Sequence, residues 1–171
     1  MIEKLKEIKC FVFDVDGVLT NGNLLVMPGG HMLRTMSVKD GYAMQLAVKK
    51  GYQIVVISGG SSPEVKERLQ KLGITEVYIQ AEDKLSILKS IIEKANFSPA
   101  NILCMGDDMP DIEIMQYAGL PCCPADAVPE IKKLSKYISP KKGGDGCARN
   151  VIEMVMRVRG DWAADAHIQA R

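Results

Sequence analysis

A short, uninterrupted apolar run, Cys10 to Phe13, ends abruptly in two carboxylates, Asp14 and Asp16, followed by Gly17. An apolar run of this length is typical of a strand that is buried on both faces of a parallel sheet. Burying a carboxylate is unfavourable unless a cation or hydrogen bonds compensate for it. The segment therefore favours a cation site at the end of a strand. A plain β-turn is the alternative for this segment alone, because Asp and Gly are common in turns.

The composition limits the classes of partner. The 171 residues fit one domain with a full hydrophobic core. A formal net charge of +1 and an aromatic content of 5% argue against nucleic acid as a partner. The charged N-terminus does not resemble a signal peptide, and no apolar stretch is long enough to span a membrane. The five cysteines include no metal-type pair, so a reduced, cytoplasmic protein is expected.

Strand-like and helix-like segments alternate along most of the chain. Apolar runs predict strands at residues 52–57, 77–79, 102–105, 120–123 and 137–138. Helical patterns follow residue 41 and begin near residues 63, 84, 112, 127 and 148. This order predicts a three-layer, Rossmann-like α/β fold with a parallel sheet covered on both faces. The domain is expected to span residues 1–160, with a C-terminal tail at 161–171.

Residues 23–36 do not fit this alternation. Two extended runs flank Pro28-Gly29-Gly30 and predict a β-hairpin that carries several large apolar side chains. Because an isolated hairpin is only marginally stable, this one is expected to pack on something, and a second copy of the chain is the expected partner. No stretch between the predicted strands, this hairpin included, is long enough for an inserted cap domain.

Polar residues follow several of the predicted strands. Ligand sites in parallel sheets lie at the carboxyl ends of the strands, so these residues are expected to meet at one edge. They are Asp14, Asp16, Ser58, Asp107, Asp108 and Asp111, with Lys84 at the start of the helix after the third strand. Carboxylates suit Mg²⁺, and Ser58 with the amides of Gly59 and Gly60 can hold an anion before a helix.

Each of these residues alone is more often a turn, cap or surface residue. Together they predict phosphoryl transfer, in which positioning and charge neutralisation do most of the work. Asp14 is the expected nucleophile, and Asp16 is the expected general acid and base.

The order of the motifs resembles the haloacid dehalogenase-like (HAD) phosphatase superfamily. Asp14-Val15-Asp16-Gly17 resembles its first motif, Ser58 its second, Lys84 its third, and Gly106-Asp107-Asp108 with Asp111 its fourth. The resemblance implies that Mg²⁺ binds the carboxylates of Asp14 and Asp107 and the main-chain carbonyl of Asp16. It also implies that Asp108 and Asp111 orient these ligands.

Within the superfamily the chain is similar to the small, capless 3-deoxy-D-manno-octulosonate 8-phosphate (KDO 8-phosphate) phosphatases. The similarity is carried by residues 17–22, the hairpin, Val38-Lys39-Asp40-Gly41, Lys84 and residues 143–146. It implies hydrolysis of KDO 8-phosphate in lipopolysaccharide precursor synthesis, by a homotetramer in which hairpins pack together and a neighbouring chain helps to close the site. The substrate-binding residues expected from it are Lys39, Asp40, Gly41, Gly59, Gly60, Arg68 and Arg149.

One position departs from the family pattern. The second motif commonly continues Thr-Gly-Arg, whereas this chain has Ser58-Gly59-Gly60, so an arginine that would face the sugar acid is absent. Bacterial 2-keto-3-deoxynononate 9-phosphate phosphatases share the scaffold and vary here, which makes a nine-carbon keto-sugar acid (or acylneuraminate) 9-phosphate the alternative substrate. A non-catalytic oligomerisation module of sugar-nucleotide synthesis is a further alternative. The presence of Asp14, Asp16, Lys84 and Asp107 argues against that module.

Overall fold

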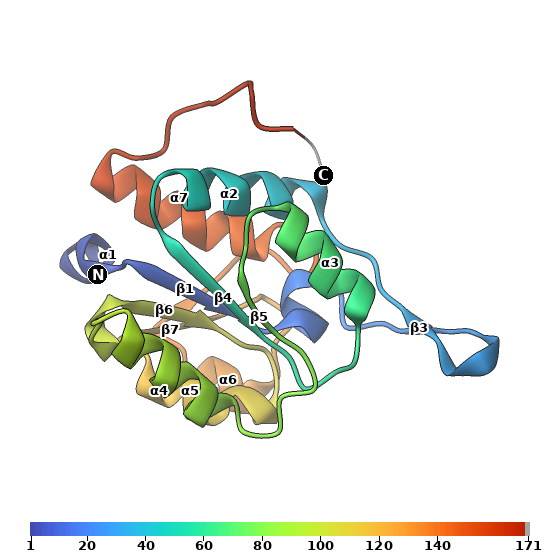
Figure 1. The fold of residues 1–171 in the computed structure, drawn as a ribbon. Coiled ribbons are helices and arrows are strands. Elements are labelled where there is room, and N and C mark those ends of the chain that lie inside the picture. The colour runs from blue at the N-terminus through green and yellow to red at the C-terminus, as the bar shows by residue number, and fades with distance from the viewer. Residues whose placement is uncertain (170–171) are drawn as a thin grey trace.

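The computed structural model describes residues 1–169 and confirms the three-layer α/β architecture (Figure 1). Within this part of the chain, one parallel sheet has the strand order β5-β4-β1-β6-β7-β8. The strands are β1 Cys10–Phe13, β4 Gln53–Ile57, β5 Glu76–Tyr78, β6 Ile102–Met105, β7 Leu120–Cys123 and β8 Tyr137–Ile138. From β1 the chain adds β4 and β5 on one side of the sheet, and then β6, β7 and β8 on the other side. The point where the strand order reverses, beside β1, is where sheets of this kind place their ligand sites.

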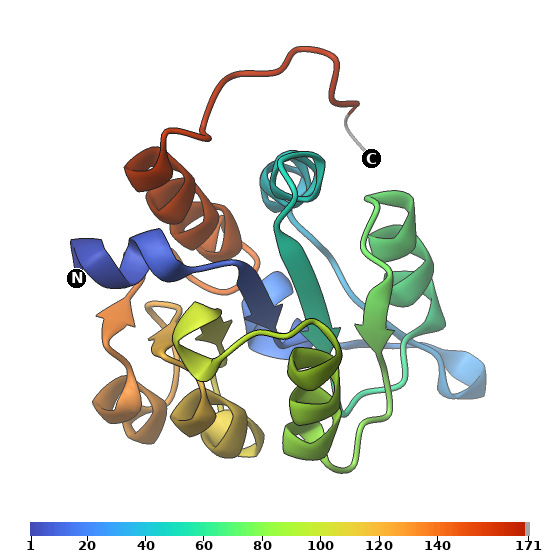
Figure 2. The ribbon, with the colours of Figure 1, turned by 60° about the vertical axis from the view of Figure 1, so that its left-hand side comes forward.

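Helices cover both faces of the sheet (Figure 2). On one face lie α2 Val38–Lys49, α3 Pro63–Lys71 and α7 Cys147–Arg159, and on the other lie α4 Lys84–Lys94, α5 Ile112–Tyr117 and α6 Pro129–Leu134. A further helix, α1 Ile2–Glu7, was not expected from the sequence and packs against α7. None of the described helices is long and apolar enough to cross a membrane.

The side chains of β1 alternate between two hydrophobic cores. Phe11 and Phe13 pack in the core on the side of α2 and α7, whereas Cys10 and Val12 pack in the core on the side of α4 and α5. All four side chains are fully buried. Burial on both faces explains why the strand is an apolar run without polar alternation.

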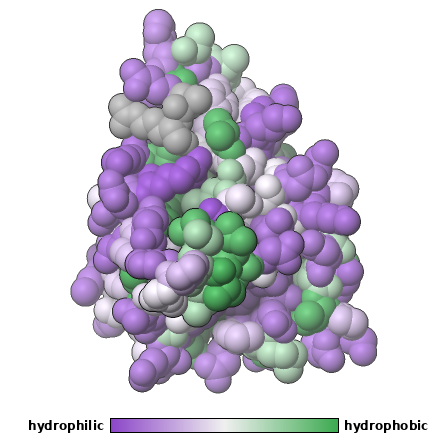
Figure 3. All heavy atoms as spheres, turned by 90° about the vertical axis from the view of Figure 1, so that its right-hand side faces the viewer, coloured by the Kyte–Doolittle hydropathy of each residue, from purple (hydrophilic) through white to green (hydrophobic). Residues whose placement is uncertain are grey.

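The hairpin is present and projects from the body of the molecule (Figure 1). Its strands, β2 Leu25–Val26 and β3 Met32–Leu33, pair antiparallel. Six of its apolar residues are 40% to 69% exposed: Leu24, Leu25, Val26, Met27, Met32 and Leu33. Figure 3 looks onto this end of the molecule and shows apolar side chains gathered in one area. An exposed apolar area of this kind marks an interaction surface.

The residues after α7 return along α2. Tyr42 exchanges hydrogen bonds with the main chain of Asp165, and the Tyr42 ring meets Trp162 edge-on. Lys49 forms an ion pair with Asp165. The division into a domain at 1–160 and a tail at 161–171 stays a prediction, and residues 170–171 lie outside the described part of the chain.

Candidate active site

The register of the central strands brings the predicted site residues to one edge. Phe13, the last residue of β1, pairs with Val56 of β4 and with Met105 of β6. The segments after these strands therefore leave the sheet side by side. Together with the start of α4, these segments line a cavity of about 550 Å³. The predicted site residues in its lining are Asp14, Asp16, Ser58, Gly59, Gly60, Lys84, Asp107, Asp108 and Asp111. Several acidic residues that the motifs did not point to, Glu82, Asp83 and Glu113, also line it.

Lys84 lies between two buried carboxylates. Its Nζ atom is 2.8 Å from Oδ1 of Asp14 and 2.7 Å from Oδ1 of Asp111. The helix that carries it begins there because Asp83 accepts the N–H of Ser86 as an N-cap. Burial alone would lower the pKa of Lys84, but attraction to the two carboxylates outweighs it and raises the pKa. The lysine therefore stays a cation in the site.

Three carboxylates converge around this single ammonium group. Ligand oxygens of Asp14, Asp107 and Asp111 all lie within 4.8 Å of one another. The pKa of Asp14 and that of Asp107 are each raised to about 7, first by burial and then by the repulsion of neighbouring carboxylates. A cluster of hard oxygen ligands with excess negative charge fits Mg²⁺ by its donor chemistry.

Two glycines let these carboxylates approach the backbone. Gly17 has a φ of 91°, and a Cβ atom there would lie 1.9 Å from Oδ2 of Asp107. A Cβ atom on Gly106 would lie 2.4 Å from that of Asp111, whose Oδ2 accepts the N–H of Asp107 at 3.0 Å. Side chains at these glycines would push the acidic residues out of the cluster.

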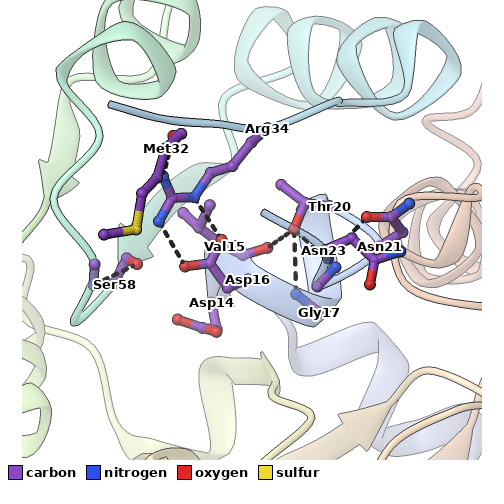
Figure 4. Close-up of polar contacts among 12 residues, drawn as sticks. Asp14, Val15, Asp16, Gly17, Thr20, Asn21, Asn23, Met32, Arg34 and Ser58 are labelled. Carbon is purple, nitrogen blue, oxygen red and sulfur yellow. Dashed lines mark hydrogen bonds and ion pairs between the residues drawn. The ribbon is translucent and has the colours of Figure 1, made fainter. Parts of the chain in front are cut away.

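A turn over Val15–Leu19, which is not helical at Asp16 and Gly17, carries Asp16 into the cavity, and Thr20 holds this turn together. The hydroxyl of Thr20 donates to the carbonyl of Val15 and accepts the N–H groups of Gly17 and Gly22 (Figure 4). Thr20 is fully buried, so these bonds are protected from water. Hydrogen bonds among its own residues thus hold the loop after β1 in place.

Comparisons with known proteins agree with this geometry. Residues 74–151 match the sequence profile of haloacid dehalogenase-like hydrolases. The chain is 31% identical over 160 residues to the 3-deoxy-D-manno-octulosonate 8-phosphate phosphatase KdsC of Escherichia coli (strain K12). This match covers 94% of this chain and 85% of that protein. The chain belongs to the KDO 8-phosphate phosphatase family. The resemblance inferred from the motifs is confirmed.

Solved structures of this phosphatase family share the fold. The Yersinia pestis KDO 8-phosphate phosphatase has a TM-score of 0.90 at 28% identity, over 94% of this chain and 86% of that one. The Moraxella catarrhalis enzyme, which was solved with a magnesium ion, a phosphate ion and a KDO molecule, has a TM-score of 0.88 at 30% identity, over 92% and 90% of the two chains.

The family motifs did not point to Arg34, which holds Asp16. The guanidinium lies 2.6 Å from Oδ1 and 3.0 Å from Oδ2 of Asp16 (Figure 4). Arg34 follows β3, far from the strand ends in sequence. One weak sequence signal could have identified this residue: Arg34 is the sole lysine or arginine between residues 23 and 36.

Of the substrate-binding residues expected from the phosphatase family, Gly59 and Gly60 line the acidic cavity, whereas Lys39, Arg68 and Arg149 lie away from it. Arg68 lines a smaller cavity of about 270 Å³ beside the hairpin, which Arg34 also lines. Lys39 and Arg149 line a third cavity of about 390 Å³ with Asp145. The guanidinium of Arg149 packs over the rings of Tyr42 and Trp162.

Asp40 and Gly41 are buried in the first turn of α2. This helix begins earlier than expected because the hydroxyl of Ser37 accepts the N–H of Asp40. Oδ1 of Asp40 accepts the N–H of Arg149 at 2.7 Å, in the first turn of α7. Its Oδ2 has no hydrogen-bond partner among the described residues. In this conformation Asp40 caps a helix and does not face the acidic cavity.

Proposed function

We propose that this protein hydrolyses KDO 8-phosphate to KDO and inorganic phosphate with Mg²⁺ as its cofactor. The observation that carries the proposal is the convergence of Asp14, Asp107, Asp111 and Lys84 in one cavity of a chain that belongs to this phosphatase family. Keeping two buried carboxylates and one partly buried carboxylate close together destabilises the fold through their mutual repulsion, and a non-catalytic module would have no need of such a cluster.

The carboxylates of Asp14 and Asp107 and the main-chain carbonyl of Asp16 would hold the Mg²⁺ ion. Bound there, the ion neutralises charge on the phosphate oxygens. Asp111 accepts the N–H of Asp107 and pairs with Lys84, so it orients a metal ligand and a cation together. Asp108 lies at the wall of the same cavity.

Hydrolysis proceeds in two steps. A carboxylate oxygen of Asp14 forms a bond to phosphorus, the bond from phosphorus to the sugar oxygen breaks, and the carboxyl proton of Asp16 passes to that oxygen. A water molecule then attacks phosphorus, Asp16 takes up its proton, and the bond from phosphorus to Asp14 breaks. The products are the sugar acid and phosphate, and the enzyme returns to its starting state.

The chain's own groups hold the phosphate in both steps. Ser58 is nearly buried at the end of β4, and its hydroxyl accepts the N–H of Gly60 at 3.2 Å. Gly59 and Gly60 line the same wall of the cavity, and the ammonium group of Lys84 lies beside the nucleophile, 2.8 Å from Oδ1 of Asp14. Hydrogen-bond donors fixed in this way stabilise developing charge without reorganising.

Assembly into a homotetramer through the exposed hairpin is part of this proposal. The apolar residues of β2 and β3 are 46% to 69% exposed, so the described part of one chain leaves much of their surface uncovered. Lys39, Arg68 and Arg149 lie outside the acidic cavity, so we assign them to substrate contacts made across a boundary between subunits. We also assign the protein to the cytoplasm, because all five cysteines are free thiols and that compartment keeps thiols reduced.

The deciding experiment measures phosphate release with Mg²⁺ from KDO 8-phosphate and from 2-keto-3-deoxynononate 9-phosphate side by side. A clear preference in kcat/KM for the eight-carbon acid is expected. Preference for the nine-carbon acid would keep the chemistry and change the substrate, with Gly60 as the first position to examine. Release from neither would return the oligomerisation module as the better explanation.

A further inference from the structure

The buried guanidinium of Arg34 clamps the partly exposed carboxylate of Asp16 by binding both of its oxygens. Its Nε and Nη2 atoms hold the two oxygens of Asp16, and its Nη1 atom donates to the carbonyl of Met32 at 3.0 Å. The side chain of Arg34 is 4% exposed, whereas that of Asp16 is 32% exposed. The guanidinium is therefore anchored to the hairpin on one side and to the active site on the other (Figure 4).

Gly60 provides the space for this clamp. A Cβ atom on Gly60 would lie 2.9 Å from Nη2 of Arg34 and 3.0 Å from Oδ2 of Asp16. Both distances are shorter than ordinary contacts, so even a methyl group would displace one of the paired groups. The absence of a side chain at position 60 therefore leaves the space in which the guanidinium of Arg34 pairs with Asp16.

A clamped carboxyl group has an advantage in proton transfer. An aspartate side chain without partners moves among several rotamers, whereas a guanidinium fork fixes both of its oxygens. Misplacing a catalytic group by 1 Å can cost on the order of 100-fold in rate. The oxygen of Asp16 that delivers the proton exchanges its bond to Arg34 for one to the leaving oxygen, while the other oxygen keeps its bond to Arg34.

We propose that Arg34 is a positioning residue of the hydrolysis, which holds the carboxyl group of Asp16 toward the leaving oxygen from the space beside Gly60. This inference rests on the proposed phosphatase function. It also links the hairpin to the chemistry, because any displacement of β3 would move the clamp.

The dependence of the rate on the leaving group provides the test. A weakly basic leaving group such as p-nitrophenolate departs without much help from an acid, whereas phenolate and a sugar alkoxide need the proton. Arg34→Gln should lower kcat/KM about 30-fold or more for KDO 8-phosphate and phenyl phosphate, but by less than about 3-fold for p-nitrophenyl phosphate. Arg34→Lys keeps the charge without the fork and should fall between the wild type and Arg34→Gln.

A control comes from α1, where the exposed side chain of Lys6 forms an ion pair with Glu3 outside the site. Lys6→Gln should leave kcat/KM unchanged for all three substrates. Circular dichroism and the thermal midpoint of each variant show whether it is folded. A merely structural role of Arg34 would lower the rates with both aryl phosphates equally.

Gly60→Ala tests the space argument independently. This substitution should reproduce part of the leaving-group effect in the wild-type background and add little to Arg34→Gln, because the displaced clamp is already gone. Equal losses on phenyl and p-nitrophenyl phosphate, no loss on either, or full additivity of the two substitutions would overturn the inference. Inactivity of the wild type on KDO 8-phosphate alone would overturn the proposed substrate, and the two aryl phosphates would still decide the role of Arg34.

Discussion

The ammonium group of Lys84 lies 2.7 Å from Oδ1 of Asp111, and both side chains are less than a tenth exposed. The same ammonium reaches Asp14 at 2.8 Å, while the second oxygen of Asp111 accepts the N–H of Asp107. One aspartate therefore sets the position of the lysine and of the loop that follows β6. The nucleophile, the cation and the metal-binding loop form a single hydrogen-bonded unit.

Lys84→Met should damage both activity and stability. Removing one partner of a buried ion pair leaves the others uncompensated, so the free energy of unfolding without Mg²⁺ should fall by about 3 kcal/mol. Phosphate release should fall at least about 100-fold, because a fixed cation at the phosphate is lost. Denaturant unfolding and a turnover assay measure the two effects. Lys94→Met, an exposed change in the same helix, is the control, and an equal effect of the two variants would contradict this account.

Asp14→Asn should abolish turnover while the protein stays folded. The amide cannot attack phosphorus, yet it has the shape of the carboxyl group. Because burial and Asp111 raise the pKa of Asp14 to about 7, the charged form is the unfavourable one in the metal-free fold. The metal-free variant should therefore have a thermal midpoint at or above that of the wild type at about pH 8. Wild-type turnover in Asp14→Asn would refute the assignment of the nucleophile.

The effect of Mg²⁺ on stability should depend on pH. The pKa values of Asp14 and Asp107 are raised to about 7 in the folded protein. Between about pH 4 and 7 the metal-free folded state binds more protons than the unfolded state, so the free energy of unfolding falls as the pH rises. Mg²⁺ binds the deprotonated carboxylates and reverses this loss.

Thermal unfolding with Mg²⁺ and with a chelator checks this dependence. The rise in thermal midpoint caused by Mg²⁺ should be small at about pH 5.5 and large at about pH 8. The Asp107→Asn variant should respond weakly at both pH values, because a metal ligand is gone. A response of equal size at both pH values in the wild type would rule out the clustered carboxylates as the binding site.

The strand ends were predictable because local patterns identify them. The apolar runs before Asp14, Ser58 and Asp107 are short and continuous, and a parallel sheet places their ends at one edge. Lys84 could be added because it opens a helix that returns to that edge. The same reasoning predicted the hairpin, since its turn residues are distinctive.

Contacts between segments far apart in the chain could not be predicted in this way. No local pattern states that Arg34 crosses to Asp16, or that Gly60 leaves room for it. The contact of Asp40 with the substrate stays a prediction from the family motif, whereas no local pattern indicated that its carboxylate accepts the N–H of Arg149 at the start of α7. Such pairings depend on how the helices pack on the sheet, which one sequence does not show.

Leu25→Asp should break the proposed assembly. Leu25 is 62% exposed in β2, among the other exposed apolar residues of the hairpin. A buried charge at an interface is costly, so the variant should have a smaller mass by light scattering than a tetrameric wild type. His31→Asp, at the exposed turn, adds the same charge and should leave the mass unchanged. A Leu25→Asp protein with the mass of the wild type would argue against assembly through the hairpin.

Asp40→Ala should lower stability more than it affects substrate binding. The carboxylate accepts the N–H of Arg149 at the start of α7, and loss of such a cap costs about 1–2 kcal/mol. Asp40→Asn keeps an acceptor oxygen and removes a charge that burial disfavours, as the raised pKa of Asp40 indicates, so it should stay close to the wild type. Urea unfolding and the KM for KDO 8-phosphate separate the two roles. A raised KM in Asp40→Ala without a loss of stability would contradict this prediction and support the substrate contact expected from the family motif.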